Sequence, residues 1–283
     1  MQMNLRMGRI EIDATQEITM LDVTASYRHR LTPPTVTLLG AGPGDPELLT
    51  IKACNALRDA DLILYDHLVS DDVMHLAPAS AEKIYVGKQA ARHALAQTEI
   101  CQLMVAKALE GRRVLRLKGG DGFIFGRGGE EAQALAEAGI PFVVIPGITS
   151  AQGAAASTGI PLTHRDHSRA LIFTTGHLKN DQTVDLDWPM LARPHQTVVI
   201  YMGLGTLPII SQSLIAHGLS PDTPAALIER ATTCQERCFT ATIQELANVA
   251  REHQMVSPTL IVIGEVVKLH ATLSPFCSEL IHS

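Results

Sequence analysis

The sequence predicts an α/β protein made of two α/β domains that flank a cofactor cleft. From residue 36 onward, short runs of β-branched residues or leucine alternate with longer segments of helical periodicity, as in βαβ units. Two of the short runs lead into glycine-rich turns, and proline and glycine interrupt the pattern between residues 146 and 159. We therefore expect an N-terminal domain over 35–147 and a C-terminal domain over 148–270, with small molecules binding between them.

The segments outside these two domains lack sustained periodicity. Residues 1–34 mix methionine, acidic residues, threonine and arginine, and they end at Pro33 and Pro34, which together break any helix. This segment is expected to be a flexible N-terminal extension. Residues 271–283 are expected to form a C-terminal tail.

In the first domain, apolar runs of four or five residues predict strands at 36–39, 61–65, 83–86, 114–117 and 142–145. Helices are predicted at 97–109 and 130–138, because apolar residues in the first of these recur at helical spacing. The strands are expected to form a parallel sheet and to be buried on both faces.

The second domain begins with a helix of small residues at 150–157. Strands are predicted after it at 170–175, 198–202, 225–228, 237–242 and 259–263. This series indicates a second α/β unit.

Composition limits the possible functions. The chain has 283 residues, is 46% hydrophobic and carries a formal net charge of -6, so its overall field repels nucleic acid and anionic membranes. An anionic substrate must therefore meet local arginines. The five cysteines have no paired spacing, and we find neither a secretory leader nor a long apolar run, so we expect a soluble protein in a reducing cytoplasm.

The first glycine turn, residues 40–46, follows the strand at 36–39. A dinucleotide-binding fingerprint would need glycine where this turn has Asp45, which disfavours an NAD-dependent oxidoreductase. A phosphate-binding P-loop is also disfavoured. In the other glycine cluster, Lys118 precedes Gly119 and Gly120, whereas a P-loop lysine follows its glycines. A tight strand-to-helix turn with Asp45 or Thr50 as N-cap explains this loop equally well.

The second glycine cluster favours function more strongly. Five of the ten residues 119–128 are glycine, which costs backbone entropy on folding without burying any side chain. We expect glycine here to let the main chain approach a ligand, with Asp121, Arg127 and Glu130 beside it. For Glu130 the alternative is an ordinary helix start, where the dipole favours negative charge.

Other candidates carry weaker signals. Asp66 and Lys88 each follow a predicted strand, at the edge of a parallel sheet where ligands bind, although simple exposure to solvent explains them equally well. The run 164–167 contains two histidines but lacks the spacing of a zinc pair, so no metal is expected. Cys234 and Cys238 are interpreted as small core residues.

At these motifs the chain resembles the tetrapyrrole methylase family. The resemblance covers about residues 36–269 and rests on nine ordered motifs, at 39–46, 65–69, 85–88, 115–121, 123–128, 144–151, 159–165, 175–177 and 201–203. It implies the class III methyltransferase fold, usually as a homodimer.

The resemblance also implies an activity. S-adenosylmethionine would methylate C2 and C7 of uroporphyrinogen III, giving precorrin-2 and S-adenosylhomocysteine for sirohaem, cobalamin or haem d1. Some relatives carry a further N-terminal dehydrogenase and chelatase domain, for which the 33 leading residues are too few, so we expect the chain to stop at precorrin-2. The alternatives are another precorrin methyltransferase and a non-catalytic S-adenosylmethionine-binding regulator.

The family's functional residues carry over by matching motifs. The implied contacts of S-adenosylmethionine are Pro43, Gly119, Gly120, Asp121, Ile124, Thr149, Ser150, Met202 and Ala231. The substrate's acid groups would meet Arg127 and Arg165, with His177 and Met202 as further substrate contacts. Proton transfer would fall to Glu130, Asp66 or Lys88.

The chain departs from the family pattern at three positions. Gly122 stands where proline is usual, Gln89 where arginine is usual, and Ala231 where glycine is frequent. The loop at Gly122 is expected to be more mobile, and the loss of a charge at Gln89 is expected to alter substrate affinity. We expect activity to survive.

Overall fold

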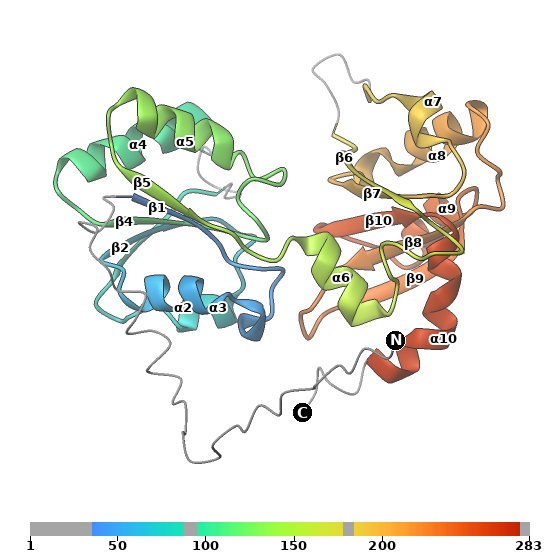
Figure 1. Ribbon diagram of the computed structural model, residues 1–283, viewed down its shortest axis with the longest axis horizontal. Coiled ribbons are helices and arrows are strands. Elements are labelled where there is room, and N and C mark those ends of the chain that lie inside the picture. The colour runs from blue at the N-terminus through green and yellow to red at the C-terminus, as the bar shows by residue number, and fades with distance from the viewer. Residues whose placement is uncertain (1–35, 88–94, 178–183, 278–283) are drawn as a thin grey trace, which may run out of the picture. The chain divides into compact units, whose positions relative to one another are not determined.

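The computed structural model describes residues 36–87, 95–177 and 184–277 (Figure 1). The expected N-terminal extension lies outside these ranges, as do Lys88 and Gln89.

The first sheet is parallel, as the sequence predicts. It contains β1 (Val36–Gly40), β2 (Leu62–Tyr65), β3 (Glu82–Tyr85), β4 (Val114–Lys118) and β5 (Phe142–Ile145). The spatial order is β3-β2-β4-β1-β5, and each neighbouring pair is parallel. The carboxyl ends of all these strands therefore meet at one edge of the sheet.

Helices cover both faces of this sheet (Figure 1). After the short 3-10 turn η1 (Pro46–Leu48), α2 (Ile51–Arg58) and α3 (Asp71–His75) pack on one face. On the other face lie α4 (Gln97–Leu109) and α5 (Gly128–Glu137). Asp45 and Thr50 accept hydrogen bonds from the first turns of η1 and α2, so both N-cap predictions are confirmed.

The second sheet is mixed, so the βαβ pattern expected from residue 36 onward does not continue through this domain. It contains β6 (Ala170–Thr175), β7 (Gln196–Tyr201), β8 (Pro224–Glu229), β9 (Arg237–Thr242) and β10 (Thr259–Ile263), in the order β6-β7-β10-β8-β9. Only the β6–β7 pair of these strands is parallel. The turn at 230–236 between β8 and β9 is too short for the crossover that a parallel pair needs.

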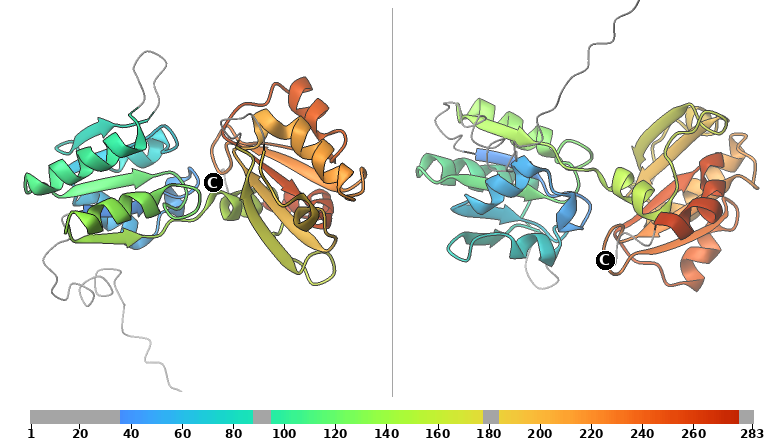
Figure 2. Two further views of the ribbon diagram at one scale, coloured as in Figure 1. Left: turned by 90° about the horizontal axis from the view of Figure 1, so that it is seen from above. Right: turned by 60° about the horizontal axis from the view of Figure 1, so that its bottom comes forward.

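This sheet also has helices on both faces. One face is covered by α6 (Ser150–Thr158), η3 (Glu265–Leu269) and α10 (His270–Cys277). On the other face are α7 (Trp188–Leu191), η2 (Leu204–Thr206), α8 (Leu207–Ala216) and α9 (Leu246–Glu252). Helix α6 packs beside α10 (Figure 2). Between them, His270 Nδ1 lies 2.6 Å from the Thr158 carbonyl oxygen.

The strands differ in burial more than the sequence indicates. Every residue of β4 and β10 is buried, which fits their inner positions in the two sheets. By contrast, β3, β6 and β9 contain exposed residues. All three lie at sheet edges, and for β3 the expectation that each strand of the first domain is buried on both faces is wrong.

Candidate functional site

The two glycine-rich loops are bonded to each other, backbone to backbone. Gly42 N donates to the Gly120 carbonyl at 3.1 Å, and Gly120 N donates to the Gly42 carbonyl at 2.6 Å. The loops meet because β1 and β4 are neighbouring parallel strands. They form a single unit at the carboxyl edge of the first sheet, which is where ligands bind in such sheets.

The glycines allow close approach of the chain to itself. A Cβ atom on Gly147 would lie 2.3 Å from the Gly120 carbonyl oxygen, and one on Gly128 would lie 2.4 Å from the Gly122 carbonyl oxygen. Gly120 also has a φ of +66°, which side chains disfavour. The sequence interpretation assigned these glycines to ligand approach, whereas the structure requires several of them for packing of its own backbone.

Asp121 ties the second loop to the segment after β5. Its Oδ1 accepts a hydrogen bond from Phe123 N at 2.8 Å, and its Oδ2 accepts one from Gly147 N at 3.0 Å. Both carboxylate oxygens therefore hold the loop in place. Each oxygen has a further lone pair with which it can accept a bond from a ligand.

The structure brings together most of the residues that the resemblance assigns to the methyl donor. A Cβ on Gly120 would lie 3.4 Å from Ser150 Oγ and 3.9 Å from Thr149 Cα, and one on Gly153 would lie 2.5 Å from Pro43 Cγ. The turn at 231–233 reaches the same place, because Asp45 N donates to Thr232 Oγ1 at 3.2 Å. These residues come from four separate stretches of sequence.

Ile124 and Met202 lie near this group through their neighbours. Ile124 N donates to the Asp121 carbonyl at 3.3 Å. Met202 directly follows Tyr201, whose hydroxyl oxygen is 2.7 Å from Thr149 Oγ1. The Met202 side chain is 55% exposed and its φ is 54°, a conformation that bulky residues adopt at a cost.

Arg127 and Glu130 form an ion pair at the surface. Arg127 Nη2 donates to Glu130 Oε2 at 2.6 Å and Nε donates to Oε1 at 3.0 Å. The hydrogen bonds lower the pKa of Glu130 and raise that of Arg127. A lower pKa makes Glu130 a weaker base, so either predicted role requires this pair to open.

The other predicted substrate residues are more dispersed. Asp66 accepts a bond from Arg116 Nη2 at 3.1 Å at the end of β2. His177 is exposed just after β6, next to Gly176, on which a Cβ would lie 2.6 Å from Gly203 Cα. Arg165 is exposed in the turn at 164–168, and within the described ranges no contact joins it to another predicted site residue.

A buried charge cluster beneath the second loop was not predicted. Arg116 and Lys118 project from β4, and both donate to Glu131 Oε1, from Nε at 3.1 Å and from Nζ at 3.0 Å. Gln97 Nε2 is a third donor to the same oxygen, at 3.1 Å. In the described chain Glu131 Oε2 is buried without a partner. Burial and the nearby Arg116 lower the pKa of Lys118.

The sequence does carry a signal for this cluster. Two cations at alternate positions of a buried strand lie on one face of the sheet and require a carboxylate partner. Glu131 lies in the first turn of α5, beside Glu130, and its side chain is completely buried.

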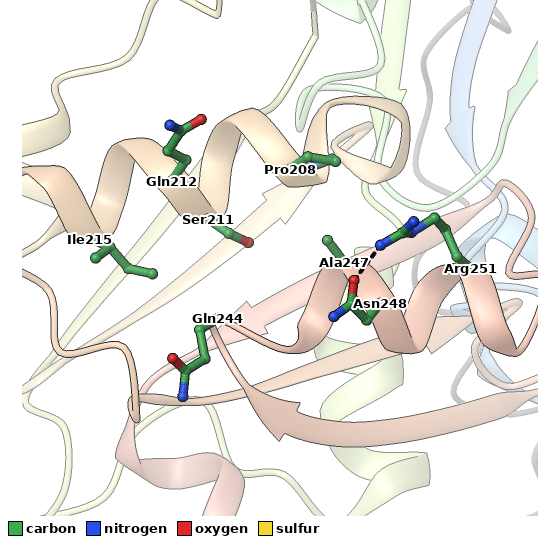
Figure 3. A pocket seen from close by; sticks show the side chains of 8 residues that line it. All are labelled: Pro208, Ser211, Gln212, Ile215, Gln244, Ala247, Asn248 and Arg251. Carbon is green, nitrogen blue, oxygen red and sulfur yellow. Dashed lines mark hydrogen bonds between the residues drawn. The ribbon is translucent and has the colours of Figure 1, made fainter.

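A separate groove of about 620 Å³ lies between α8 and α9. Figure 3 shows its lining, with Ser211 and Ile215 from α8 facing Ala247 and Asn248 from α9. None of the predicted site residues lines it.

The described residues contain no group of three or more acidic, histidine or cysteine side chains placed to hold a metal ion. Nor do they contain a helix with the length and apolarity needed to cross a bilayer.

Known proteins are similar to this chain in both sequence and fold. Residues 35–247 match the family "Tetrapyrrole (Corrin/Porphyrin) Methylases". Siroheme synthase of Pseudomonas aeruginosa strain UCBPP-PA14 is 55% identical over 241 residues, which are 85% of this chain and 52% of that protein. The chain thus spans about half the length of the curated relatives it matches.

Two solved structures are similar over nearly their whole length. Uroporphyrin-III C-methyl transferase from Thermus thermophilus complexed with S-adenyl homocysteine is 41% identical, with a TM-score of 0.71 over 83% of this chain and 99% of that one. The cobalamin biosynthetic enzyme cobalt precorrin-4 methyltransferase is 27% identical, with a TM-score of 0.73 over 82% of this chain and 96% of that one. The fold is that of the class III tetrapyrrole methyltransferases, and the chain belongs to the tetrapyrrole (corrin/porphyrin) methylase family.

Proposed function

We propose that the protein is an S-adenosylmethionine-dependent uroporphyrinogen-III C-methyltransferase that methylates C2 and C7 to give precorrin-2. The observation that carries this proposal is the convergence of both glycine loops, the start of α6 and the turn at 231–233. Similarity to the Thermus thermophilus enzyme, which was solved with S-adenyl homocysteine, supports the choice of donor and substrate.

The converging residues suit the donor chemically. Backbone groups around Gly119 and Gly120, the free lone pairs of Asp121 and the hydroxyls of Thr149 and Ser150 offer many hydrogen bonds in a small space. Pro43, Ile124, Met202 and Ala231 would add apolar contacts. The donor, when bound, supplies an electrophilic methyl group, so the protein's main task is to align a carbon of the acceptor with it.

The acceptor carries eight carboxylates, and the protein as a whole is acidic. Arg127, Arg165 and His177 are exposed and would bind these acid groups. Arg127 would then exchange its partner Glu130 for a substrate carboxylate. This exchange costs little free energy, because the Arg127–Glu130 pair lies at the surface.

Product formation requires loss of a proton from the ring. Asp66 and Glu130 are the described carboxylates proposed to accept it, and Lys88 is proposed as a donor. Asp66 is better placed for a fixed role, because Arg116 orients its carboxylate from inside the sheet. The Glu130 carboxylate becomes a stronger base once Arg127 turns to the substrate.

The domain boundaries, the oligomeric state and the cellular location are proposed as well. We assign the N-terminal domain to 35–147 and the C-terminal domain to 148–270, with the cofactor cleft between them, and we expect a cytoplasmic homodimer that needs no metal and binds no nucleic acid. The name siroheme synthase belongs to relatives about twice as long, so it is not transferred to this chain.

The test is a mass measurement of the product. Purified protein is incubated anaerobically with uroporphyrinogen III and S-adenosylmethionine carrying a labelled methyl group, beside a reaction without donor. Two added methyl groups per macrocycle support the proposal. No transfer to uroporphyrinogen III, with transfer to a later precorrin, would assign the chain to another methyltransferase of the family. Binding of S-adenosylhomocysteine without transfer to any acceptor would favour a regulator.

A further inference from the structure

Tyr201 lies where three segments of the candidate site meet. It ends β7 and directly precedes Met202. Its hydroxyl oxygen is 2.7 Å from Thr149 Oγ1 and accepts a hydrogen bond from Ala151 N at 3.2 Å. Its ring centroid is 5.0 Å from that of Phe125, in the second glycine loop. The two ends of this side chain therefore contact different parts of the site.

The hydroxyl completes the N-terminus of α6. The first N–H groups of a helix have no partner within the helix, and an N-cap side chain usually accepts one of them. Here the N-cap is Thr149, and its Oγ1 bonds the Tyr201 hydroxyl while that hydroxyl accepts from Ala151 N. A residue about fifty positions away thus fixes the turn that carries Thr149 and Ser150.

The ring supports the loop that carries Arg127. Phe173 contacts the Tyr201 ring at a centroid distance of 5.8 Å, and Phe125 contacts it at 5.0 Å. Phe125 is 40% exposed and has a φ of 53°, and Arg127 has a φ of 60°. Bulky side chains keep such a backbone only where their surroundings hold it. The aromatic contact is one such support.

We infer that Tyr201 is a positioning residue with two separable effects: its hydroxyl sets the affinity for the methyl donor through α6, and its ring sets acceptor turnover through Phe125 and the loop carrying Arg127. This inference rests on the proposed function. Burial raises the pKa of Tyr201, so the phenol keeps its proton at neutral pH and its hydrogen bonds persist there.

The test separates the two effects. Tyr201→Phe removes the hydroxyl and keeps the ring, so it should weaken binding of S-adenosylhomocysteine, measured by calorimetry, by about five- to tenfold. Its kcat at saturating donor should stay within about twofold of the original protein. Phe125→Ala should do the reverse, lowering kcat/KM for uroporphyrinogen III by about tenfold with donor affinity unchanged.

Two controls identify the cause. Thr197→Val removes another buried hydroxyl, which donates a hydrogen bond of 2.8 Å to Ser168 Oγ. This bond is not part of the glycine loops, so the variant should change neither donor binding nor turnover. The double variant Thr149→Val, Tyr201→Phe should lose less affinity for S-adenosylhomocysteine than the two single variants lose together, because each single change already removes the same hydrogen bond.

The outcomes distinguish this inference from the proposed function. If the original protein neither binds S-adenosylhomocysteine nor methylates uroporphyrinogen III, the proposed function fails and the inference falls with it. If the original protein does both and Tyr201→Phe binds the donor product equally well, the inference alone is wrong. It is also wrong if both variants lower donor affinity and kcat together in step with their melting temperatures.

Discussion

Lys118 and Glu131 form an ion pair inside the protein, with Nζ 3.0 Å from Oε1 and side chains that are 5% and 0% exposed. Arg116 shares the same carboxylate oxygen and also holds Asp66. Two buried cations thus depend on one buried carboxylate and one carboxylate at the sheet edge. Such an arrangement is sensitive to loss of a partner, because an unpaired charge cannot regain its hydration.

Replacing Glu131 with glutamine should therefore be strongly destabilising. The neutral amide leaves Arg116 and Lys118 with Asp66 as the remaining carboxylate of the cluster. We expect a loss of about 3–5 kcal/mol in the free energy of unfolding, measured by urea denaturation. Glu110→Gln breaks the exposed pair with Lys107 and should cost at most about 1 kcal/mol. Equal stability of the two variants would contradict this account of the cluster.

Two adjacent glycines at the start of α5 should respond to alanine in opposite ways. A Cβ on Gly128 would lie 2.4 Å from the Gly122 carbonyl oxygen, whereas one on Gly129 would meet nothing within 4 Å. Gly128→Ala should lower the free energy of unfolding by about 1–3 kcal/mol. Gly129→Ala should raise it by up to about 1 kcal/mol, since alanine favours the helix. Thermal unfolding of both variants checks this, and a stabilising Gly128→Ala would be inconsistent with the loop geometry.

Arg127 allows a test of function that does not damage the fold. Because its φ is 60°, Arg127→Gly removes the guanidinium from a conformation that glycine adopts freely. The free energy of unfolding should stay within about 1 kcal/mol of the original value. Turnover of uroporphyrinogen III should fall at least about tenfold while S-adenosylhomocysteine still binds.

The matched control for Arg127 is Arg112→Ala, which removes an arginine paired with Glu82 at the surface. It should leave turnover unchanged. Normal turnover of Arg127→Gly would remove this residue from the mechanism.

The cysteines of the 230–236 turn and β9 should differ in reactivity. Burial raises the pKa of the Cys238 thiol to about 12, whereas Cys234 is exposed, so the interpretation of Cys234 as a core residue is wrong. Alkylation requires the thiolate, so iodoacetamide at pH 8 should label Cys234 well before Cys238, and raising the pH to 9 should not change the order. Peptide mapping by mass spectrometry measures both rates. A sample in urea should label both at similar rates, and similar rates in the native protein would be contrary to the structure.

The strands were predictable because short runs of apolar or β-branched residues mark them in the sequence. All ten were found, with ends that differ by at most two residues from the expected ranges. The direction of β8, β9 and β10 was not predictable in the same way. A run of apolar or β-branched residues identifies a strand, but the length of the connection decides whether its neighbour can be parallel.

The site was predictable in outline. The glycine loops and Asp121 stand out in the sequence, yet which atoms their backbone approaches depends on contacts between distant segments. The Tyr201 hydroxyl gives a similar example, because the sequence near Tyr201 does not indicate a bond to Thr149. The cluster around Glu131 could have been predicted, since alternating cations in a buried strand demand a partner.

The paired hydrogen bonds between Gly42 and Gly120 also constrain how this protein can diverge. An insertion in either turn would displace the other, because each holds its neighbour's main chain directly. Among related sequences, a change of length in one of these two turns should therefore be accompanied by a change in the other.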